Sequence, residues 1–198
     1  VVVFEELYLN GSLIAEHRDI TDEDQTIHFP KIETKVMVKE TKSNIAKADK
    51  EITLVDTVSY KNLQPGKKYN LTGTLMDKET GEPVKDPEGE EVTAKTSFKP
   101  ETADGTVNVT FTFDGSNLAG KTLVVFENLE RNDTVYAVHT DIHDEAQTIY
   151  FPEIGTTVKD AVSGTQFSAA GQVSLVDTVS YNNLTPKTEY ALKGILMD

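Results

Sequence analysis

The chain repeats itself, and this repeat limits what it can fold into. Residues 1–34 match residues 123–156 without a gap, and 19 of the 34 positions are identical. A second block, residues 54–63, returns as residues 175–184 with nine of ten positions identical. A period of about 122 residues is too long for a solenoid unit and is typical of successive domains that each bury their own core. The sequence therefore predicts one complete repeat at 30–151, the C-terminal part of a preceding repeat at 1–29, and the N-terminal part of a following repeat at 152–198.

Composition excludes several classes of function. The 198 residues carry 19 Lys and Arg against 33 Asp and Glu, a net charge of −14. This acidic surplus argues against binding nucleic acid or an anionic membrane surface, which require a positive footprint. No apolar run approaches the roughly 20 residues that a membrane helix needs, so membrane insertion is not expected. Cysteine is absent, which rules out disulfides and thiolate chemistry and leaves a good core or another covalent staple as the source of stability.

The hydrophobic pattern predicts strands. Residues 106–113 alternate throughout and place Val107, Val109, Phe111 and Phe113 on one face, and residues 69–75 alternate after a Pro-Gly turn. Short alternating segments between turn signals, without a long helical period, favour an all-β fold of immunoglobulin-like β-sandwich repeats in tandem, one complete and two partial. One short helical turn is expected within residues 40–49.

Five polar residues of the complete repeat fall on the apolar side of their strands when the period-2 rule is applied. Each alone has an ordinary explanation, such as a hydrogen-bonded core histidine or a turn-capping aspartate. Buried charges are costly unless they are paired, however, and the partial copies keep the same residue types. Together they supply a hydroxyl nucleophile, a base, two carboxylates and a carbonyl electrophile. The five are Thr34, Asp56, Glu127, His139 and Gln147, and their counterparts in the partial repeats are Thr156, Asp177, Glu5, His17 and Gln25.

These residues lie in motifs that are specific in their spacing. The pattern His-x-Asp-x-x-Asp-x-x-Gln-Thr occupies residues 139–148 and 17–26. Val-x-Phe-Glu stands at 124–127 and 2–5, with Val where Ala is frequent, and Pro-x-Ile-x-Thr at 30–34 and 152–156. Over essentially its whole length, the chain resembles the VaFE-repeat, Thr–Gln ester-bond-forming immunoglobulin-like domains of Gram-positive surface adhesins.

The resemblance implies a self-formed cross-link. The hydroxyl of Thr34 would attack the carboxamide of Gln147 and release ammonia, leaving an ester between the first and last strands. His139 would take the hydroxyl proton and return it to the leaving nitrogen. Asp56 and Glu127 would share one proton, and the protonated carboxyl would polarise the Gln147 carbonyl. The two motif aspartates, Asp141 and Asp144, are interpreted as turn-forming.

The resemblance also implies a role and a location. The chain would belong to the stalk of an extracellular, cell-wall-anchored adhesin, with its anchor signal outside this sequence. Its partners would be neighbouring repeats, and any host ligand would bind a tip domain elsewhere. No cofactor or metal is needed, and a Thr34 consumed by its own Gln147 reacts once, so the chain is not a turnover enzyme. Only residues 30–151 hold the full reacting set, and cross-linking between the partial repeats of two molecules is not expected.

Two other readings of the sequence remain. A related stalk domain with a Lys–Asn or Lys–Asp isopeptide bond would need an inward lysine near the domain start, and strand alternation points Lys35 outward, with Lys39 the other candidate. A calcium or ligand-binding module would use Asp19, Asp22, Glu23 and Asp24, but the second copy has Ala146 in place of Asp24 and the pattern does not match an EF-hand loop.

Overall fold

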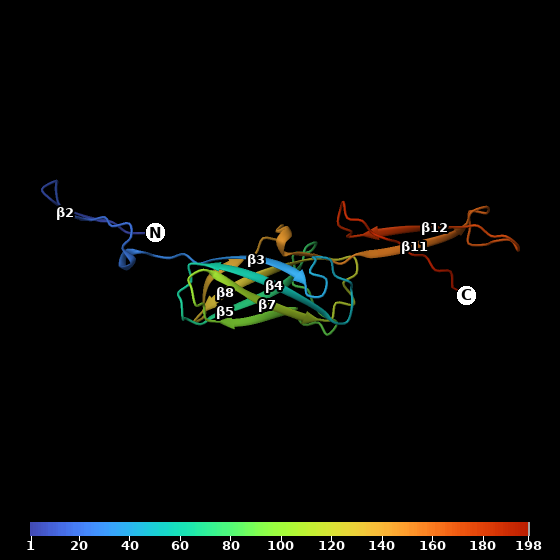
Figure 1. The fold of residues 1–198 in the computed structure, drawn as a ribbon, viewed down its shortest axis with the longest axis horizontal. Helices are drawn as coiled ribbons and strands as arrows, with labels where there is room; N and C mark the ends of the chain where they lie inside the picture. The colour runs from blue at the N-terminus through green and yellow to red at the C-terminus, as the bar shows by residue number, and fades with distance from the viewer. Residues whose placement is uncertain (198) are drawn as a thin grey trace.

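A computed structural model describes residues 1–197 and folds residues 31–151 into two facing antiparallel sheets (Figure 1). The first sheet has three strands in the order β3-β4-β7: β3 (Lys31–Val38), β4 (Ile52–Lys61) and β7 (Gly105–Phe113). The second runs in the order β10-β8-β5-β6, with β9 also paired to β8: β5 (Tyr69–Asp77), β6 (Thr93–Phe98), β8 (Thr122–Arg131), β9 (Thr134–His139) and β10 (Thr148–Tyr150).

Two isolated hairpins flank the sandwich along the long axis of the molecule (Figure 1). The N-terminal hairpin pairs β1 (Glu5–Leu9) with β2 (Ser12–His17), and the C-terminal hairpin pairs β11 (Glu153–Asp160) with β12 (Leu175–Asn182). Two short 3-10 turns, η1 (Glu23–Gln25) and η2 (Glu145–Gln147), follow β2 and β9. The hairpins lie at the positions in the repeat that β8–β9 and β3–β4 occupy in the sandwich.

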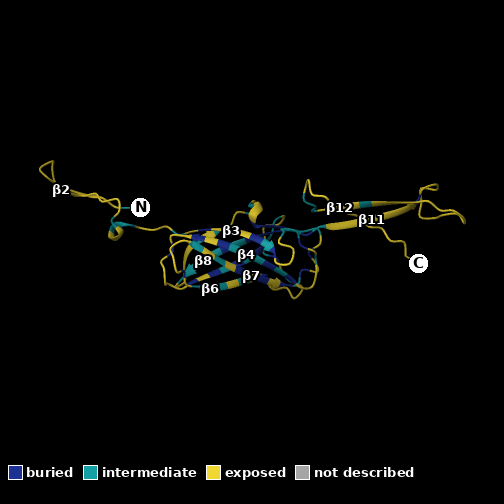
Figure 2. Ribbon diagram, in the orientation of Figure 1, coloured by how far each residue is buried: buried dark blue, intermediate teal, exposed yellow. Residues whose placement is uncertain are grey.

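The core lies between the two sheets of the sandwich. Alternate residues of β4 and β7 point inward, so that Leu54, Val58, Val109 and Phe111 are buried together. Figure 2 shows buried residues in the sandwich and almost none in the flanking hairpins. Period-2 alternation on facing sheets produces this pattern, because each strand turns every second side chain toward the other sheet. The prediction of an all-β sandwich is confirmed.

The helical turn expected within residues 40–49 is wrong. The segment forms a turn and then an extended stretch, in which Ile45 bridges β10 in parallel at Tyr150. The Tyr150 amide donates to the Asn44 carbonyl at 2.9 Å, and the Ala46 amide donates to the Tyr150 carbonyl at 2.9 Å. The backbone groups of this segment are satisfied by the edge of β10, so a helical turn gains nothing.

Successive repeats are joined closely. Phe151 is buried in the sandwich core, and β11 begins at Glu153, so Pro152 alone separates them. The side-chain amide of Asn183 donates to the carbonyl of Gly120 across this junction at 2.5 Å. Within residues 1–197 no helix has the length and apolarity to cross a bilayer.

Candidate cross-linking site

Four of the five predicted residues meet inside the sandwich. Thr34 on β3 and Asp56 on β4 are near neighbours, because Thr34 pairs with Val58 and Asp56 pairs with Val36 in the β3–β4 register. Glu127 projects from β8 in the opposite sheet, and Gln147 ends the η2 turn. Thr34 is 7% exposed, Glu127 is 1% exposed, and Asp56 and Gln147 are fully buried. The fold therefore encloses a polar cluster within an apolar core.

Thr34 and Gln147 are in direct contact. The Gln147 side-chain amide donates a hydrogen bond to the Thr34 hydroxyl oxygen, across 113 positions of sequence. Because the amide nitrogen is bonded to the carbonyl carbon, this contact puts the hydroxyl oxygen beside the carbon that it would attack. A nucleophile and an electrophile held together in a closed site need no approach by diffusion.

The two carboxyl groups have unequal affinities for a proton. The pKa of Glu127 is raised to about 10, mainly because the carboxyl is buried and secondly because the charge of Asp56 lies nearby. Burial also raises the pKa of Asp56, while Glu127, the Thr34 hydroxyl and the charge of His139 act in the opposite direction. One proton therefore resides on Glu127 at neutral pH, and like-charge repulsion keeps the pair from ionising fully.

The cluster also contains unsatisfied oxygens. Among residues 1–197, no donor satisfies the buried carboxylate oxygens of Asp56 and Glu127 or the carbonyl oxygen of Gln147. The Thr34 hydroxyl lies near enough to Asp56 to lower its pKa. It does not make a hydrogen bond to either Asp56 oxygen. Unpaired buried polar atoms are expensive and uncommon in folded proteins. A proton on Glu127 turns one of these acceptors into a donor, which makes hydrogen bonding within the cluster possible.

His139 is positioned by a residue to which the sequence assigned only a turn-forming role. The Asp144 carboxylate accepts the backbone amide of Ala146 at 2.8 Å, which caps η2, and its other oxygen lies 2.8 Å from Nε2 of His139. Asp144 therefore shapes the turn and also orients the imidazole. The signal was present in the sequence, because the same pair five residues apart recurs as His17 and Asp22, 2.9 Å apart.

The other imidazole nitrogen faces the first strand. Nδ1 of His139 lies 3.4 Å from the carbonyl oxygen of Ile32, on β3 two residues before Thr34. Within residues 1–197, His139 makes no hydrogen bond to Thr34, so the predicted contact between base and nucleophile is not formed. The strand alternation that turns His139 inward also predicts an inward Val135, but Val135 is exposed, because the β8–β9 register shifts between Leu129 and Glu130.

Gly73 is a residue of the site that the sequence analysis missed. It pairs with Glu127 in the β5–β8 register. A Cβ atom added at Gly73 would overlap the Glu127 carboxylate and lie 2.5 Å from the Phe111 ring. The space for the Glu127 side chain therefore depends on a glycine in the neighbouring strand. A glycine inside an otherwise alternating strand is the sequence signal for such a close approach.

The partial repeats carry their residues on open hairpins. Glu5 and His17 are exposed and Gln25 is half-buried, and the Gln25 amide donates to the Glu5 carboxylate at 2.8 Å. Thr156 and Asp177 are exposed on β11 and β12. These two residues do not meet the N-terminal group, so within residues 1–197 the buried cluster is assembled in residues 30–151 alone.

The alternative sites lack the geometry that they need. Lys35 and Lys39 are exposed, so neither enters the buried cluster, as an isopeptide bond would require. Asp19 accepts from the amide and hydroxyl of Thr21, and Asp22 accepts from the amide of Asp24, so both carboxylates are engaged within their turn. Residues 1–197 contain no group of three candidate metal ligands.

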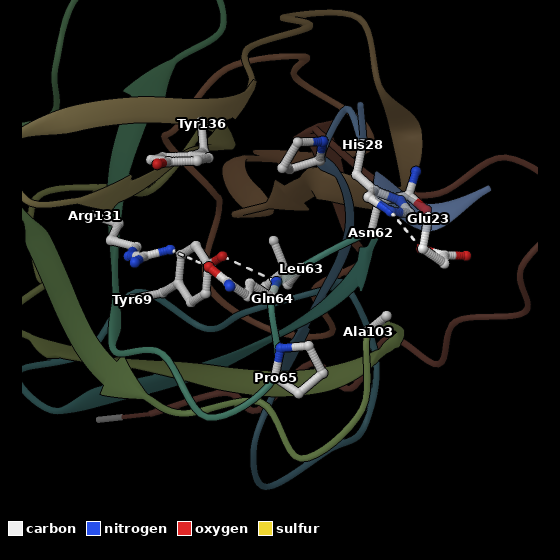
Figure 3. Close-up of a pocket in the computed structure, with 11 residues that line it drawn as sticks. Glu23, His28, Asn62, Leu63, Gln64, Pro65, Tyr69, Ala103, Arg131 and Tyr136 are labelled. Carbon is white, nitrogen blue, oxygen red and sulfur yellow. Dashed lines mark hydrogen bonds and ion pairs between the residues drawn. The ribbon is translucent and has the colours of Figure 1, made fainter. Parts of the chain in front are cut away.

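One pocket of the described residues is lined by none of the five predicted site residues. It has a volume of about 620 Å³, and its lining comes from η1, the segment between η1 and β3, the β4–β5 turn, and the β8–β9 hairpin (Figure 3). Its polar groups bond one another, as where the Arg131 guanidinium donates to the Gln64 side-chain carbonyl at 2.9 Å. Neither Thr34 nor Gln147 lines this pocket. Thr34 and Gln147 are buried in the core rather than presented in this pocket.

A known protein family matches this chain along its whole length. The family model described as "T-Q ester bond containing domain" matches residues 1–29, 30–151 and 152–198. No curated protein matches. A bacterial adhesin from Mobiluncus mulieris containing intramolecular disulfide, isopeptide and ester bond cross-links is structurally similar in two crystal forms. One form has a TM-score of 0.48 and 16% sequence identity, and the match covers 78% of this chain and 77% of that chain. The other form has a TM-score of 0.46 and 18% identity, and the match covers 77% of this chain and 76% of that chain. A glycosyl hydrolase family 2 member from Bacteroides cellulosilyticus gives 0.42 at 14% identity, over 78% of this chain and 17% of that one.

Proposed function

This chain belongs to the family of T-Q ester bond containing domains, and from that membership we propose that Thr34 and Gln147 form the ester of its complete repeat. The observation that carries the proposal is the buried contact between the Gln147 carboxamide and the Thr34 hydroxyl. An oxygen nucleophile and a carboxamide enclosed together, with a carboxyl pair beside them, suit a single acyl transfer.

The proposed reaction balances within the cluster. The Thr34 hydroxyl gives its proton to His139, and the oxygen bonds to the carbonyl carbon of Gln147. Protonated Glu127 donates a hydrogen bond to the oxyanion that develops on the Gln147 carbonyl oxygen. The C–N bond then breaks, and His139 returns the proton to the departing nitrogen, which leaves as ammonia. His139 has to leave the Ile32 carbonyl to do so, and contacts of this kind often tighten only as the reaction proceeds.

Burial serves the product as well as the reaction. An ester exposed to water would hydrolyse, whereas the same bond between two sheets is shielded. The charge of His139 favours the ionised form of Asp56, so Asp56 is the carboxyl suited to stabilise the imidazolium that forms during transfer. Each Thr34 reacts once, so the chemistry is autocatalytic cross-linking rather than turnover.

We infer that the bond serves a mechanical role in a surface stalk. The ester would join β3, which begins the repeat, to the turn that precedes β10, which ends it. Load applied to the two ends of an array passes through these first and last segments, and a covalent link there bypasses the hydrogen-bonded ladder. The end-to-end arrangement of the repeats and their single-residue linker support a load-bearing stalk (Figure 1). From the family resemblance we also propose that the protein is displayed outside the cell, on a Gram-positive cell wall, as part of an adhesin.

Intact mass spectrometry of the purified, denatured chain tests the proposed bond. We expect a mass about 17 Da below that of the sequence, the loss of one ammonia. Thr34→Val and Gln147→Ala should each restore the full mass. Retention of the full mass by the unaltered, folded chain would refute the cross-link, and a deficit that persists in Thr34→Val would assign it to other residues.

A further inference from the structure

We propose that Glu145 is a positioning residue for ester formation: its carboxylate clamps the η2 turn between Lys78 and Tyr150 and so keeps Gln147 against Thr34. The proposal rests on the proposed function. It concerns a side chain outside the buried cluster, one that touches neither reacting group.

Both oxygens of the Glu145 carboxylate have partners from other elements. The ammonium of Lys78 donates to Oε1 at 2.9 Å, and the Tyr150 hydroxyl donates to Oε2 at 2.5 Å. Lys78 also reaches the hydroxyl of Thr148 at 3.3 Å. Acceptance by Glu145 raises the pKa of Tyr150 to about 12, so the phenol remains a donor.

Lys78 is a fixed point rather than a free surface lysine. It follows directly after β5, and its backbone amide donates to the carbonyl of Thr122 at the start of β8 at 2.9 Å. Its side chain is only 22% exposed. The ion pair therefore ties η2 to the two central strands of the larger sheet, one of which carries Glu127.

The η2 turn needs such a tie because it is short. It has three residues, and its first end is held by Asp144, which caps the turn and bonds His139. Gln147 stands at the last position, where its backbone amide bonds the Asp144 carbonyl at 3.2 Å. Acyl transfer demands close alignment of the attacking oxygen, and a displacement of about 1 Å can slow a reaction about 100-fold. Glu145 adds a second tie, to Lys78 and Tyr150, beside the one that Asp144 makes with His139.

The preceding repeat keeps one of the two Glu145 contacts. Glu23 occupies the position of Glu145, and His28 occupies that of Tyr150. Nε2 of His28 lies 3.5 Å from Oε2 of Glu23. Both copies thus pair the glutamate with a potential donor five residues later, although the residue after each glutamate changes from Asp24 to Ala146.

The exposure of Glu145 separates positioning from stability. Its side chain is 68% exposed, and exposed ion pairs contribute little to folding. Removing the carboxylate should therefore leave the fold nearly as stable while the turn loses its alignment. A change in reaction rate without a matching change in stability is the expected signature.

The experiment follows ester formation in the full chain as it is made by cell-free translation, with the fraction showing the deficit of about 17 Da measured over time. We expect Glu145→Ala to slow the reaction about 10- to 100-fold, and Glu145→Gln, which keeps an acceptor for Tyr150, to fall between Ala and the natural residue. The matched control is Glu16→Ala, which removes an exposed ion pair with Arg18 on the N-terminal hairpin, outside residues 30–151, and should leave the rate unchanged.

A second measurement removes the ambiguity of misfolding. In a Thr34→Val background, where no ester can form, Glu145→Ala should leave the urea unfolding midpoint nearly unchanged. A rate for Glu145→Ala equal to that of the natural chain would overturn the positioning role and leave the ester intact. A slow rate accompanied by a large loss of stability would also overturn it, in favour of a structural role. Absence of the deficit in the natural chain would instead refute the proposed function itself.

Discussion

Pulling the chain from its two ends tests what the proposed ester does. The bond would close a loop of 112 residues, positions 35–146, that cannot be extended while the ester is intact. At about 3.4 Å per extended residue this loop holds about 380 Å of contour length. Within residues 30–151, only the short segments before Thr34 and after Gln147 would remain free to extend. The cross-linked repeat should therefore release about 35 Å or less under load.

The perturbation is Thr34→Val, which keeps the shape of the side chain and removes the nucleophile. Optical tweezers attached at the two ends should record an extension about 380 Å longer for Thr34→Val than for the natural chain. Thr34→Ser restores a hydroxyl and should return the short extension, which controls for damage to the core. Intact mass on the same preparations reports which molecules carry the bond.

Equal long extensions in the natural chain and in Thr34→Val, with the ammonia deficit present in the former, would refute the reasoning. The bond would then exist without carrying load across the repeat. At equilibrium the same loop closure is worth nominally about 4–5 kcal/mol of unfolding free energy in the loop-entropy model. The Val variant should unfold at correspondingly lower urea concentration.

Three further predictions follow from the buried cluster. In ester-free Thr34→Val, the contribution of Glu127 to the free energy of unfolding should be greatest below about pH 4.5 and should be lost as pH rises through about 10, because folded Glu127 holds its proton with a raised pKa. Urea titrations at several pH values, compared with the same titrations after adding Glu127→Gln, isolate this contribution, and identical pH profiles would contradict it. Gly73→Ala should lower the unfolding free energy by about 1–3 kcal/mol, because the added methyl strikes the Glu127 carboxylate, and an unchanged urea midpoint would contradict the packing argument. His139→Ala should slow ester formation about 10²- to 10⁴-fold. Asp144→Asn should slow it by less, because Asp144 acts through the imidazole of His139. Time-resolved intact mass measures both rates, and an unchanged rate in Asp144→Asn would contradict the orienting role of Asp144.

The sequence predicted Thr34 and Gln147 as the reacting pair because two patterns agreed, the repeat of about 122 residues and the alternation of side chains along the strands. The repeat aligned Thr34 with Thr156 and Gln147 with Gln25, and strand alternation turned Thr34, Asp56 and Glu127 toward the core. The second signal is local, since the direction of a side chain from a strand depends only on its place in the alternation. The same reasoning failed at Val135, where a shift in the β8–β9 register breaks the alternation.

The tertiary structure decided how the pieces are held. Three contacts depend on how strands and turns pack together. Asp144 orients His139, and Gly73 leaves space for the Glu127 side chain. Glu145 bonds Lys78, which is 67 residues away in the sequence. The placement of the shared proton on Glu127 depends on burial and on the distance between two carboxyls from opposite sheets. Sequence alone determined which chemical groups this protein turns inward, because that is a property of each strand. The contacts and proton affinities of these groups arise only when the two sheets pack face to face. Desolvation and charge repulsion then act between strands that are distant in the sequence.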